Sequence, residues 1–324
     1  MSPVVWFFDF IGKHATRFMF VGVLAGLALP WFAELLKPAF TVLLLVPLIL
    51  ALMRIDWLAF RAYARRPFLI LAILVFLQLV CPVLLLGALQ PFGLPLPLVS
   101  AMVLMAAAPP IISAAAISLI LGLDAALAVI VIILSTALVP LTLPPLALLL
   151  LNMQLDVSLV EFMGRLALLV GIAFAAALLL RAITSDAWRA RNKRMMDGLA
   201  VFNLVLFAIA IMAGVTDKMM TAPGYVALTT FCAFAANLAL QALGFGFGKL
   251  VLRLGNPAAA TLGLAAGNCN MGLVMVALGD KAEFDMVVFF AMGQLPMYML
   301  PGLLYPVYKR LAQTAPPAPR SEIS

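Results

Sequence analysis

The sequence predicts an all-α integral membrane protein whose ten transmembrane helices form two inverted five-helix repeats. Three observations predict this fold class: the composition, the distribution of basic residues and an internal repeat. Of the 324 residues, 66% are hydrophobic and only 10% are charged, and the mean hydropathy is +1.19. Because a soluble domain carries about 25% charged residues, the excess of apolar residues belongs in a lipid bilayer.

Apolar runs of the length that a bilayer requires, about 20 residues, alternate with short polar segments. They place ten spans at residues 15–33, 39–53, 68–88, 95–121, 125–151, 158–182, 196–215, 224–252, 257–279 and 284–308. Residues 3–14 are expected to form an interfacial helix and not a cleavable signal peptide. We expect a single transmembrane domain over residues 1–311 and a disordered cytoplasmic tail over residues 312–324.

The basic residues predict the orientation in the membrane. The loop between spans two and three contains Arg54, Arg61, Arg65 and Arg66, and the loop between spans six and seven contains Arg189, Arg191, Lys193 and Arg194. Since cytoplasmic loops are enriched in Lys and Arg, both loops and both termini are predicted to be cytoplasmic, in the inner membrane of the cell. A nine-span alternative would put Lys309 and Arg310 outside and fits this rule less well. Topology, and not a nucleic acid partner, accounts for the net charge of +7.

An internal repeat emerges when the chain is compared with itself at an offset of 156 residues. The two copies cover residues 15–151 and 158–308, and Asp124 then meets Asp280, Pro140 meets Pro296 and Pro145 meets Pro301. Copies with an odd number of spans insert in opposite orientations, and inverted repeats are typical of secondary transporters. The alternative interpretation is that Leu-Gly-x-Asp is simply a common helix end.

Two of the spans contain residues that interrupt helices. Span four contains Ala108-Pro109-Pro110-Ile111, and span nine contains Gly267-Asn268-Cys269-Asn270 between Gly263 and Gly272. Proline removes a backbone donor and clashes with the preceding turn. Non-helical backbone inside a bilayer is tolerated only where it lines a cavity or is buried in protein. A pair of interrupted helices at matching places in two repeats therefore indicates a substrate site.

The predicted site favours an anion. Half-helices that begin near Ile112 and Met271 would direct free N–H groups and positive dipole ends toward the membrane centre. The candidate substrate-binding residues are Pro109, Pro110, Ile112, Ser113, Asn268, Asn270, Met271 and Gln294. The competing interpretation is that polar side chains in membrane helices only link neighbouring helices, and it stays open for Asn203, Asn237 and Gln241.

Catalytic and coupling groups are scarce in this sequence. All thirteen acidic residues fall in predicted loops, span ends or tails, and the single histidine, His14, precedes the first span. No carboxylate is therefore predicted at mid-membrane, where proton and ion coupling groups usually lie. No cluster of reactive side chains supports an enzyme, so we expect no enzymatic activity, no bound metal and no cofactor.

Two segments resemble a known family. Gly267-Asn268-Cys269-Asn270-Met271-Gly272-Leu273 is similar to the span-nine crossover of the bile acid:sodium symporter family, and Ser135-Thr136 followed by Pro140 and Pro144 is similar to its span five. The resemblance implies that discontinuous spans four and nine cross at the bilayer midplane. It implies a core of spans three, four, five, eight, nine and ten, and a panel of spans one, two, six and seven. It also implies Na+ as the candidate coupled ion, with Asn270, Cys269, Ser135 and Thr136 as candidate ion-binding residues.

The chain departs from that family where sodium would bind. Ala265 stands at the position of the family's glutamate, Cys269 at that of its crossover glutamine, and Ala128 and Ile132 at two hydroxyl positions. Loss of the carboxylate removes the countercharge of the ion. We therefore expect a secondary transporter of a small or amphipathic organic anion that works by alternating access, with the family's sodium ligands largely replaced. The alternatives are a sodium-independent facilitator or exchanger, and a membrane sensor or scaffold that does not transport. No oligomeric state is predicted.

Overall fold

The computed structural model describes residues 3–53, 63, 65–151 and 158–313. Within these ranges the chain is helical, and the only bridge between extended residues joins Pro110 to Cys269. The α-helices are α1 (Pro3–Lys13), α2 (Ala15–Ala28), α3 (Pro30–Leu36), α4 (Phe40–Leu52), α6 (Pro67–Val75), α7 (Cys81–Leu89), α8 (Leu96–Ala107), α9 (Ser113–Ile120), α10 (Ala125–Leu151), α11 (Leu159–Ile183), α12 (Asp186–Ala210), α13 (Val215–Thr221), α14 (Pro223–Gly246), α15 (Asn256–Gly267), α16 (Met271–Leu278), α17 (Phe284–Met292), α18 (Gln294–Leu303) and α19 (Tyr305–Gln313). Two π-helical segments, η2 (Phe76–Val80) and η4 (Phe247–Val251), continue α6 and α14.

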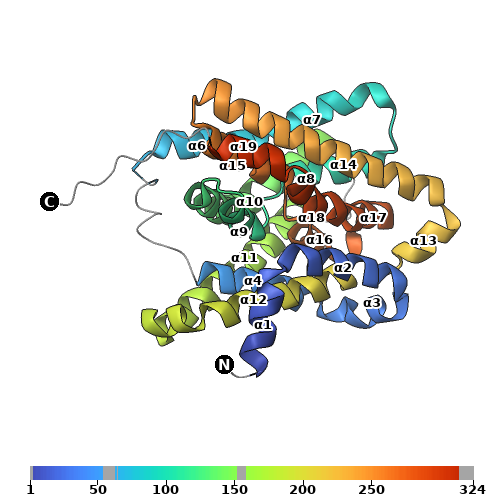
Figure 1. The fold of residues 1–324 in the computed structure, drawn as a ribbon. Helices are drawn as coiled ribbons and strands as arrows, with labels where there is room; N and C mark the ends of the chain where they lie inside the picture. Colours follow the sequence, from blue (N-terminus) through green and yellow to red (C-terminus); the bar gives the residue numbers. More distant parts are fainter. Residues whose placement is uncertain (1–2, 54–62, 64, 152–157, 314–324) are drawn as a thin grey trace.

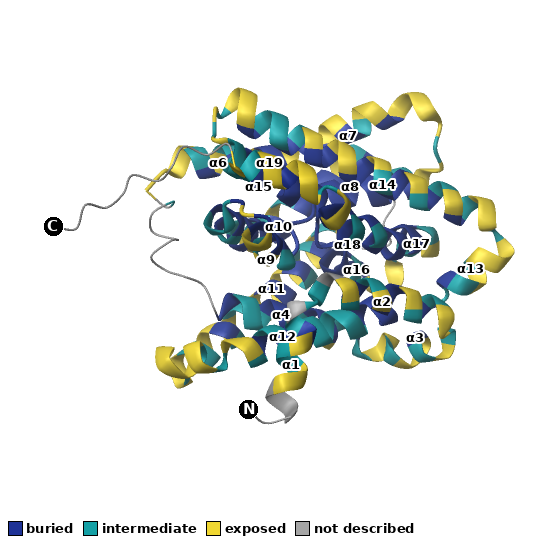
Figure 2. Ribbon diagram, viewed as in Figure 1, coloured by how far each residue is buried: buried dark blue, intermediate teal, exposed yellow. Residues whose placement is uncertain are grey.

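Apolar surface covers much of the outside of the molecule. Seven helical stretches in the described part of the chain are long and apolar enough to cross a membrane. Large apolar side chains lie exposed on them, for example Phe68, Leu149 and Phe231, which are 85%, 78% and 71% exposed. Figure 2 shows such exposed residues along the outer faces of α7 and α14. Soluble proteins rarely expose so much contiguous apolar surface, whereas lipid covers it, so this chain is a multi-pass membrane protein.

Proline divides two of the predicted spans. The first, 15–33, is interrupted at Leu29, because Pro30 lacks an N–H donor and starts α3. The last, 284–308, is divided into α17, α18 and α19. Pro296 cannot donate to the carbonyl four residues earlier, and Pro306 has the same effect at the start of α19. Both predicted spans therefore contain a turn, although Phe284–Leu303 remains one helical stretch long and apolar enough to cross a membrane.

The segment before the predicted seventh span is helical and not a loop. α12 begins at Asp186, ahead of the predicted start at residue 196. The Ser185 hydroxyl accepts a hydrogen bond from the N–H of Trp188 and caps this earlier start. At the other end of the described residues, α19 continues to Gln313. Arg54, Arg61 and residues 314–324 lie outside the described residues.

The helices form two layers. The first layer consists of α1–α4, α11 and α12, with α12 packed against α1, α2 and α4. The second layer consists of α6–α10 and α14–α19. In Figure 1, α1–α4 and α12 lie along the lower edge of the molecule, and α6, α7, α14 and α15 lie on the opposite side. α11 packs on α10 and α16, and α2 packs on α18, which joins the two layers.

Glycines allow α14 and α15 to pack very closely. A Cβ atom at Gly267 would lie 2.4 Å from Cγ of Gln241, and one at Gly263 would lie 2.6 Å from the Gln241 carbonyl oxygen. A Cβ at Gly244 would lie 2.5 Å from the carbonyl oxygen of Leu262. Small residues at an interface let membrane helices approach each other in this way. The contact fixes the position of α15, which ends at Gly267.

Candidate functional site

Two interrupted helices meet in the second layer. Helical structure stops after Ala107 at the end of α8 and resumes at Ser113, and it stops after Gly267 at the end of α15 and resumes at Met271. The two connecting segments run antiparallel, with Pro110 opposite Cys269. We call this paired region, residues 108–112 and 268–270, the crossing. Both interruptions lie where the sequence predicted them.

Backbone hydrogen bonds hold the crossing together. The Ile111 N–H donates to the Asn268 carbonyl at 2.8 Å, and the Asn270 N–H donates to the Pro109 carbonyl at 2.7 Å. Ala108 is extended, with φ −72° and ψ 152°, as expected for a residue that precedes proline. Each segment thus supplies partners for backbone groups that a continuous helix would have satisfied internally, which buried backbone requires.

The two asparagines of the crossing have different roles. Asn270 is the N-cap of α16, since its Oδ1 accepts a hydrogen bond from the Leu273 N–H at 3.2 Å. Asn268 is fully buried, and its Nδ2 donates to the Leu264 carbonyl at 2.8 Å. Within the described structure the Oδ1 atom of Asn268 has no hydrogen-bond partner, and an unpaired buried acceptor is costly. Asn268 is therefore the residue of the crossing with unused binding capacity.

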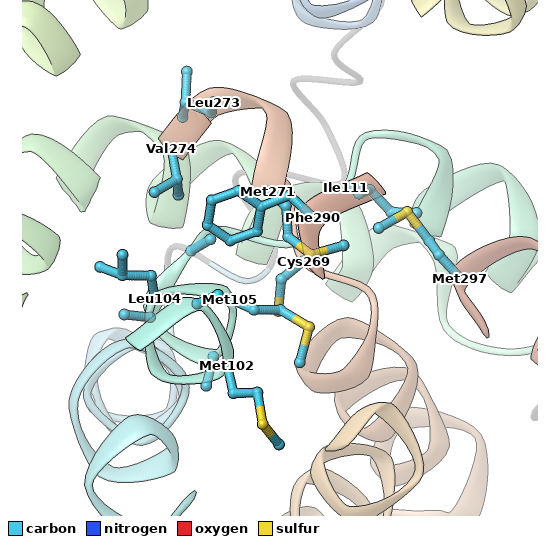
Figure 3. Packing of buried hydrophobic residues seen from close by; sticks show 14 of the residues in the cluster. Met102, Leu104, Met105, Ile111, Cys269, Met271, Leu273, Val274, Phe290 and Met297 are labelled. Carbon is cyan, nitrogen blue, oxygen red and sulfur yellow. The ribbon is translucent and has the colours of Figure 1, made fainter. Parts of the chain in front are cut away.

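A small cavity of about 40 Å³ lies beside the crossing, between the two layers. Its lining combines the starts of α9 and α16 with residues of α18 and of the first layer: Leu44, Pro47, Ile111, Ile112, Ser113, Leu204, Phe207, Cys269, Asn270, Met271, Gly272, Gln294, Met297 and Tyr298. Figure 3 shows Ile111, Cys269, Met271 and Met297 packed among neighbouring apolar side chains. The cavity is large enough for one or a few water molecules, whereas pockets that bind organic ligands have volumes of about 300–1,000 Å³. In this conformation the first layer therefore closes over the crossing.

Most of the predicted substrate-binding residues line this cavity. Ile112, Ser113, Asn270, Met271 and Gln294 do so. Pro109, Pro110 and Asn268 form the crossing itself and do not line the cavity. Of the predicted ion-binding residues, Cys269 and Asn270 line the cavity, whereas Ser135 and Thr136 are buried in α10 away from the lining.

Several lining residues were not predicted from the sequence. Tyr298 follows Gln294 by one helical turn, and its hydroxyl donates to Gln294 Oε1 at 3.0 Å. That spacing along one face of α18 was a usable signal. Leu44, Phe207 and the other first-layer residues gave no such signal, because they are apolar residues in apolar stretches of helix.

A second buried polar group lies in the second layer, where η2 packs against α10. Gln78, in the π-helical segment η2, donates from Nε2 to the Ser135 carbonyl at 2.9 Å. In the described structure Gln78 Oε1 and the Ser135 hydroxyl have no hydrogen-bond partner. π-Helical segments occur frequently at functional sites. Gln78 was not predicted from the sequence, although a lone glutamine within an otherwise apolar span was a possible signal.

The electrostatic environment of the cavity comes from dipoles. None of its lining residues has an ionisable carboxylate or a basic side chain, and in the described ranges no Asp or Glu side chain is buried. The first residues of α9 and α16 adjoin the cavity, so the positive ends of both helix dipoles are directed at it. The arrangement can stabilise negative charge with backbone N–H groups.

The profile of the Sodium Bile acid symporter family matches residues 41–222. The match covers more than half of the chain. This chain belongs to the sodium bile acid symporter family. No match was found among curated proteins.

In this sodium bile acid symporter family member, the matched range begins in α4 and ends just after α13. It includes one segment of the crossing, residues 108–112, and the first-layer residues that close the cavity. The second segment, residues 268–270, lies beyond the match. The structure therefore connects the matched half to the part of the chain that completes the crossing.

A larger apolar groove of about 530 Å³ lies on the outside of the molecule. It is lined by residues of α13 and α14 together with Met292, and includes Met219 and Phe231. It shares no lining residue with the cavity at the crossing and has almost no polar surface. A groove of this kind on the outer face of a membrane protein suits lipid chains better than a polar substrate.

Proposed function

We propose that this protein is a secondary transporter of a small or amphipathic organic anion and that it works by alternating access. The observation that carries the proposal is the crossing, where two helix N-termini adjoin a cavity free of ionised side chains between two helical layers. Backbone N–H groups would bind the anionic group. Methionine side chains such as Met271 and Met297 would provide an adaptable apolar surface for the rest of the substrate.

The proposal includes ten spans in two inverted repeats. The lengths of the interrupted helices support it: α8 and α15 each have 12 residues, and α9 and α16 each have eight. Glycines with positive φ follow both short helices, Gly122 at 73° and Gly279 at 59°. The antiparallel pairing at the crossing is what two segments in opposite orientations would give.

Transport would require the two layers to separate at the cavity. Leu44 and Phe207 of the first layer close it, and the second layer contributes Asn270 and Gln294. Rocking of one layer against the other around a fixed site is a common mechanism among transporters with inverted repeats. We therefore propose that the first layer is the mobile panel and that the second layer is the core. The basic residues of α12 support a cytoplasmic location for its first turns, in the inner membrane with both termini inside.

A specific observation favours a sodium-independent facilitator or exchanger over a symporter. Ala265, at the position of the family's glutamate, is buried and only 1% exposed, so the site lacks the countercharge that a bound cation needs. Gln78 Oε1, the Ser135 hydroxyl and Asn268 Oδ1 provide neutral oxygens only. We propose that Na+ is not required.

The test is thermal stability of the purified protein with a panel of organic anions, in sodium and in potassium buffers. A ligand that binds the folded state raises the melting temperature, by an amount that grows with its concentration above Kd. We expect an anion-specific shift in both buffers. A shift that requires sodium would contradict the facilitator and support a symporter, and no shift with any anion would contradict the proposed substrate class.

A pair of asparagine variants locates the binding site. Asn270→Ala should abolish the shift. Asn203→Ala should preserve it, because the hydrogen bond that the described residues give Asn203 stays within α12, to the Leu199 carbonyl, and Asn203 does not line the cavity. An unchanged shift in Asn270→Ala would exclude the crossing as the binding site.

A further inference from the structure

A chain of hydrogen bonds leads from the C-terminal helix to the crossing. The Tyr308 hydroxyl donates to Gln241 Oε1. Gln241 Nε2 donates to Asn237 Oδ1 at 2.6 Å, and Asn237 Nδ2 donates to the Gly267 carbonyl at 2.7 Å. All three side chains are buried, with exposed fractions of 2% to 6%. The chain thus links α19 through α14 to the end of α15.

The bonds all point in one direction. Each side-chain amide accepts with its oxygen and donates with its nitrogen, so every donor is directed toward Gly267. In a low-dielectric interior such aligned bonds strengthen one another. Gly267 is the last residue of α15, and the final carbonyls of a helix lack partners within it. The chain therefore caps α15 at the point where the crossing begins.

The end of α15 packs tightly against Asn237 of this hydrogen-bonded chain. A Cβ at Gly267 would lie 2.7 Å from the Asn237 carbonyl oxygen and 2.9 Å from Asn237 Oδ1. The next residue, Asn268, accepts the hydrogen bond from the Ile111 N–H. A shift of Asn237 would therefore displace Gly267, and with it the hydrogen-bonded pairing of the two segments.

The C-terminal helix packs on α15 and shares an apolar cluster with the α9 region. Tyr308 belongs to a cluster with Ile117 and Leu121 of the α9 region and with Ala260 and Leu264 of α15. Figure 1 shows α19 lying across α15. Tyr308 thus combines a place in this apolar cluster with the hydrogen bond to Gln241.

We propose that Tyr308, Gln241 and Asn237 are positioning residues, which set the alignment of the crossing and couple it to the C-terminal helix. None of them touches the cavity. They act through the Gly267 carbonyl, which fixes where Asn268 and Asn270 lie. Their effect on transport rests on the proposed function, whereas their effect on the geometry of the crossing does not.

The competing interpretation is that these side chains only link helices and contribute general stability. The two interpretations predict different regions of increased exposure when one of these residues is replaced. General loss of stability would expose all buried parts of the second layer alike. Loss of positioning would expose the crossing to reagents while the middle of α14 stays buried.

Two cysteines report these two regions separately. Cys269 is at the crossing and Cys232 is in α14, and both are buried, at 2% and 6% exposed. The experiment measures alkylation of each by a membrane-permeant maleimide in the full-length protein in lipid vesicles, peptide by peptide with mass spectrometry. No substrate is added, so failure of the proposed function does not affect the result.

The variant is Tyr308→Phe, which removes the hydroxyl and keeps the ring. We expect Cys269 alkylation to rise about threefold to tenfold, the range that follows from the loss of one hydrogen bond, and Cys232 alkylation to stay unchanged. Tyr305→Phe is the matched control, because Tyr305 is on the same helix but half-exposed; it should alter neither rate. Equal increases at both cysteines, or no increase at either, would overturn the proposal.

A second variant guards against a folding defect. Gln241→Met breaks the chain at its middle with a side chain of similar length. If the chain acts as a unit, Tyr308→Phe combined with Gln241→Met should raise Cys269 alkylation no more than the stronger single variant does. Multiplied effects in the double variant would show that the residues act independently and would contradict the proposal.

Discussion

Asn270 and Pro109, 161 residues apart in the chain, are joined by a hydrogen bond of 2.7 Å from the N–H of Asn270 to the carbonyl of Pro109. The bond places Asn270 where its side chain caps α16. One residue thus connects the two segments of the crossing through its backbone and starts a half-helix through its side chain.

The cap of α16 should contribute measurably to stability. Asn270→Ala removes the acceptor for the Leu273 N–H and is expected to lower the free energy of unfolding by about 0.5–2 kcal/mol. Asn270→Ser keeps an N-cap acceptor and should retain most of that stability. Thermal unfolding in detergent measures both. Identical melting temperatures for the Ala and Ser variants would contradict the assigned cap.

The close approach of α14 and α15 leaves no space for a side chain at Gly267. Gly267→Ala would put a Cβ 2.4 Å from Gln241 Cγ and 2.7 Å from the Asn237 carbonyl oxygen. Separating the helices should cost about 1–3 kcal/mol. Gly246→Ala is the matched control, because nothing lies within 4 Å of a Cβ there, and it should be neutral or slightly stabilising. The measurement is the midpoint of thermal unfolding. Equal decreases of the midpoint in Gly267→Ala and Gly246→Ala would refute the close packing.

Arg165 should stabilise the protein through its hydrogen bond at the end of α16 and much less through its ion pair with Glu161. Its Nη1 donates to the Leu278 carbonyl at 3.2 Å, which joins α11 of the first layer to α16. Arg165→Met should cost about 1 kcal/mol. In this ion pair the side chains of Arg165 and Glu161 are 39% and 46% exposed, so Glu161→Gln should have a much smaller effect. The melting temperatures of Arg165→Met and Glu161→Gln are compared. A larger decrease in melting temperature for Glu161→Gln would contradict this role of Arg165.

Tyr63 should make stability depend on alkaline pH. Burial raises the pKa of its phenol above the usual range, and the hydrogen bond to Asp124 and the charge of that carboxylate raise it further. A pKa raised in the folded state gives stability that is fully present below the unfolded value of about 10 and is lost as the pH rises through the folded pKa. The wild type should therefore lose more stability above about pH 10 than Tyr63→Phe. Melting temperatures from pH 8 to 11 measure the difference, and parallel pH profiles would exclude this role of Tyr63.

The local features of the site were predictable because they depend on the chain's own backbone. Pro109 and Pro110 lack N–H donors, so the interruption after α8 follows from two residues. Asn270 between glycine-rich sequence and an apolar run is a recognisable N-cap. The general plan of apolar helices was equally accessible, because a charged fraction of 10% leaves no other place for this chain than a bilayer.

The tertiary structure decided which surfaces meet. α4, α10 and the second half of α12, where Phe207 lies, contain no charged residue, and a helical stretch without a polar face gives no signal of its orientation. Nothing in the sequence therefore placed Phe207 and Leu44 over the crossing or directed Gln78 at Ser135. The path from Tyr308 through Gln241 and Asn237 to Gly267 joins residues of three helices, and only their packing creates it. The sequence by itself determined where the helices break, because broken hydrogen bonding is local, and the fold determined what the breaks face, because that depends on contacts between distant segments.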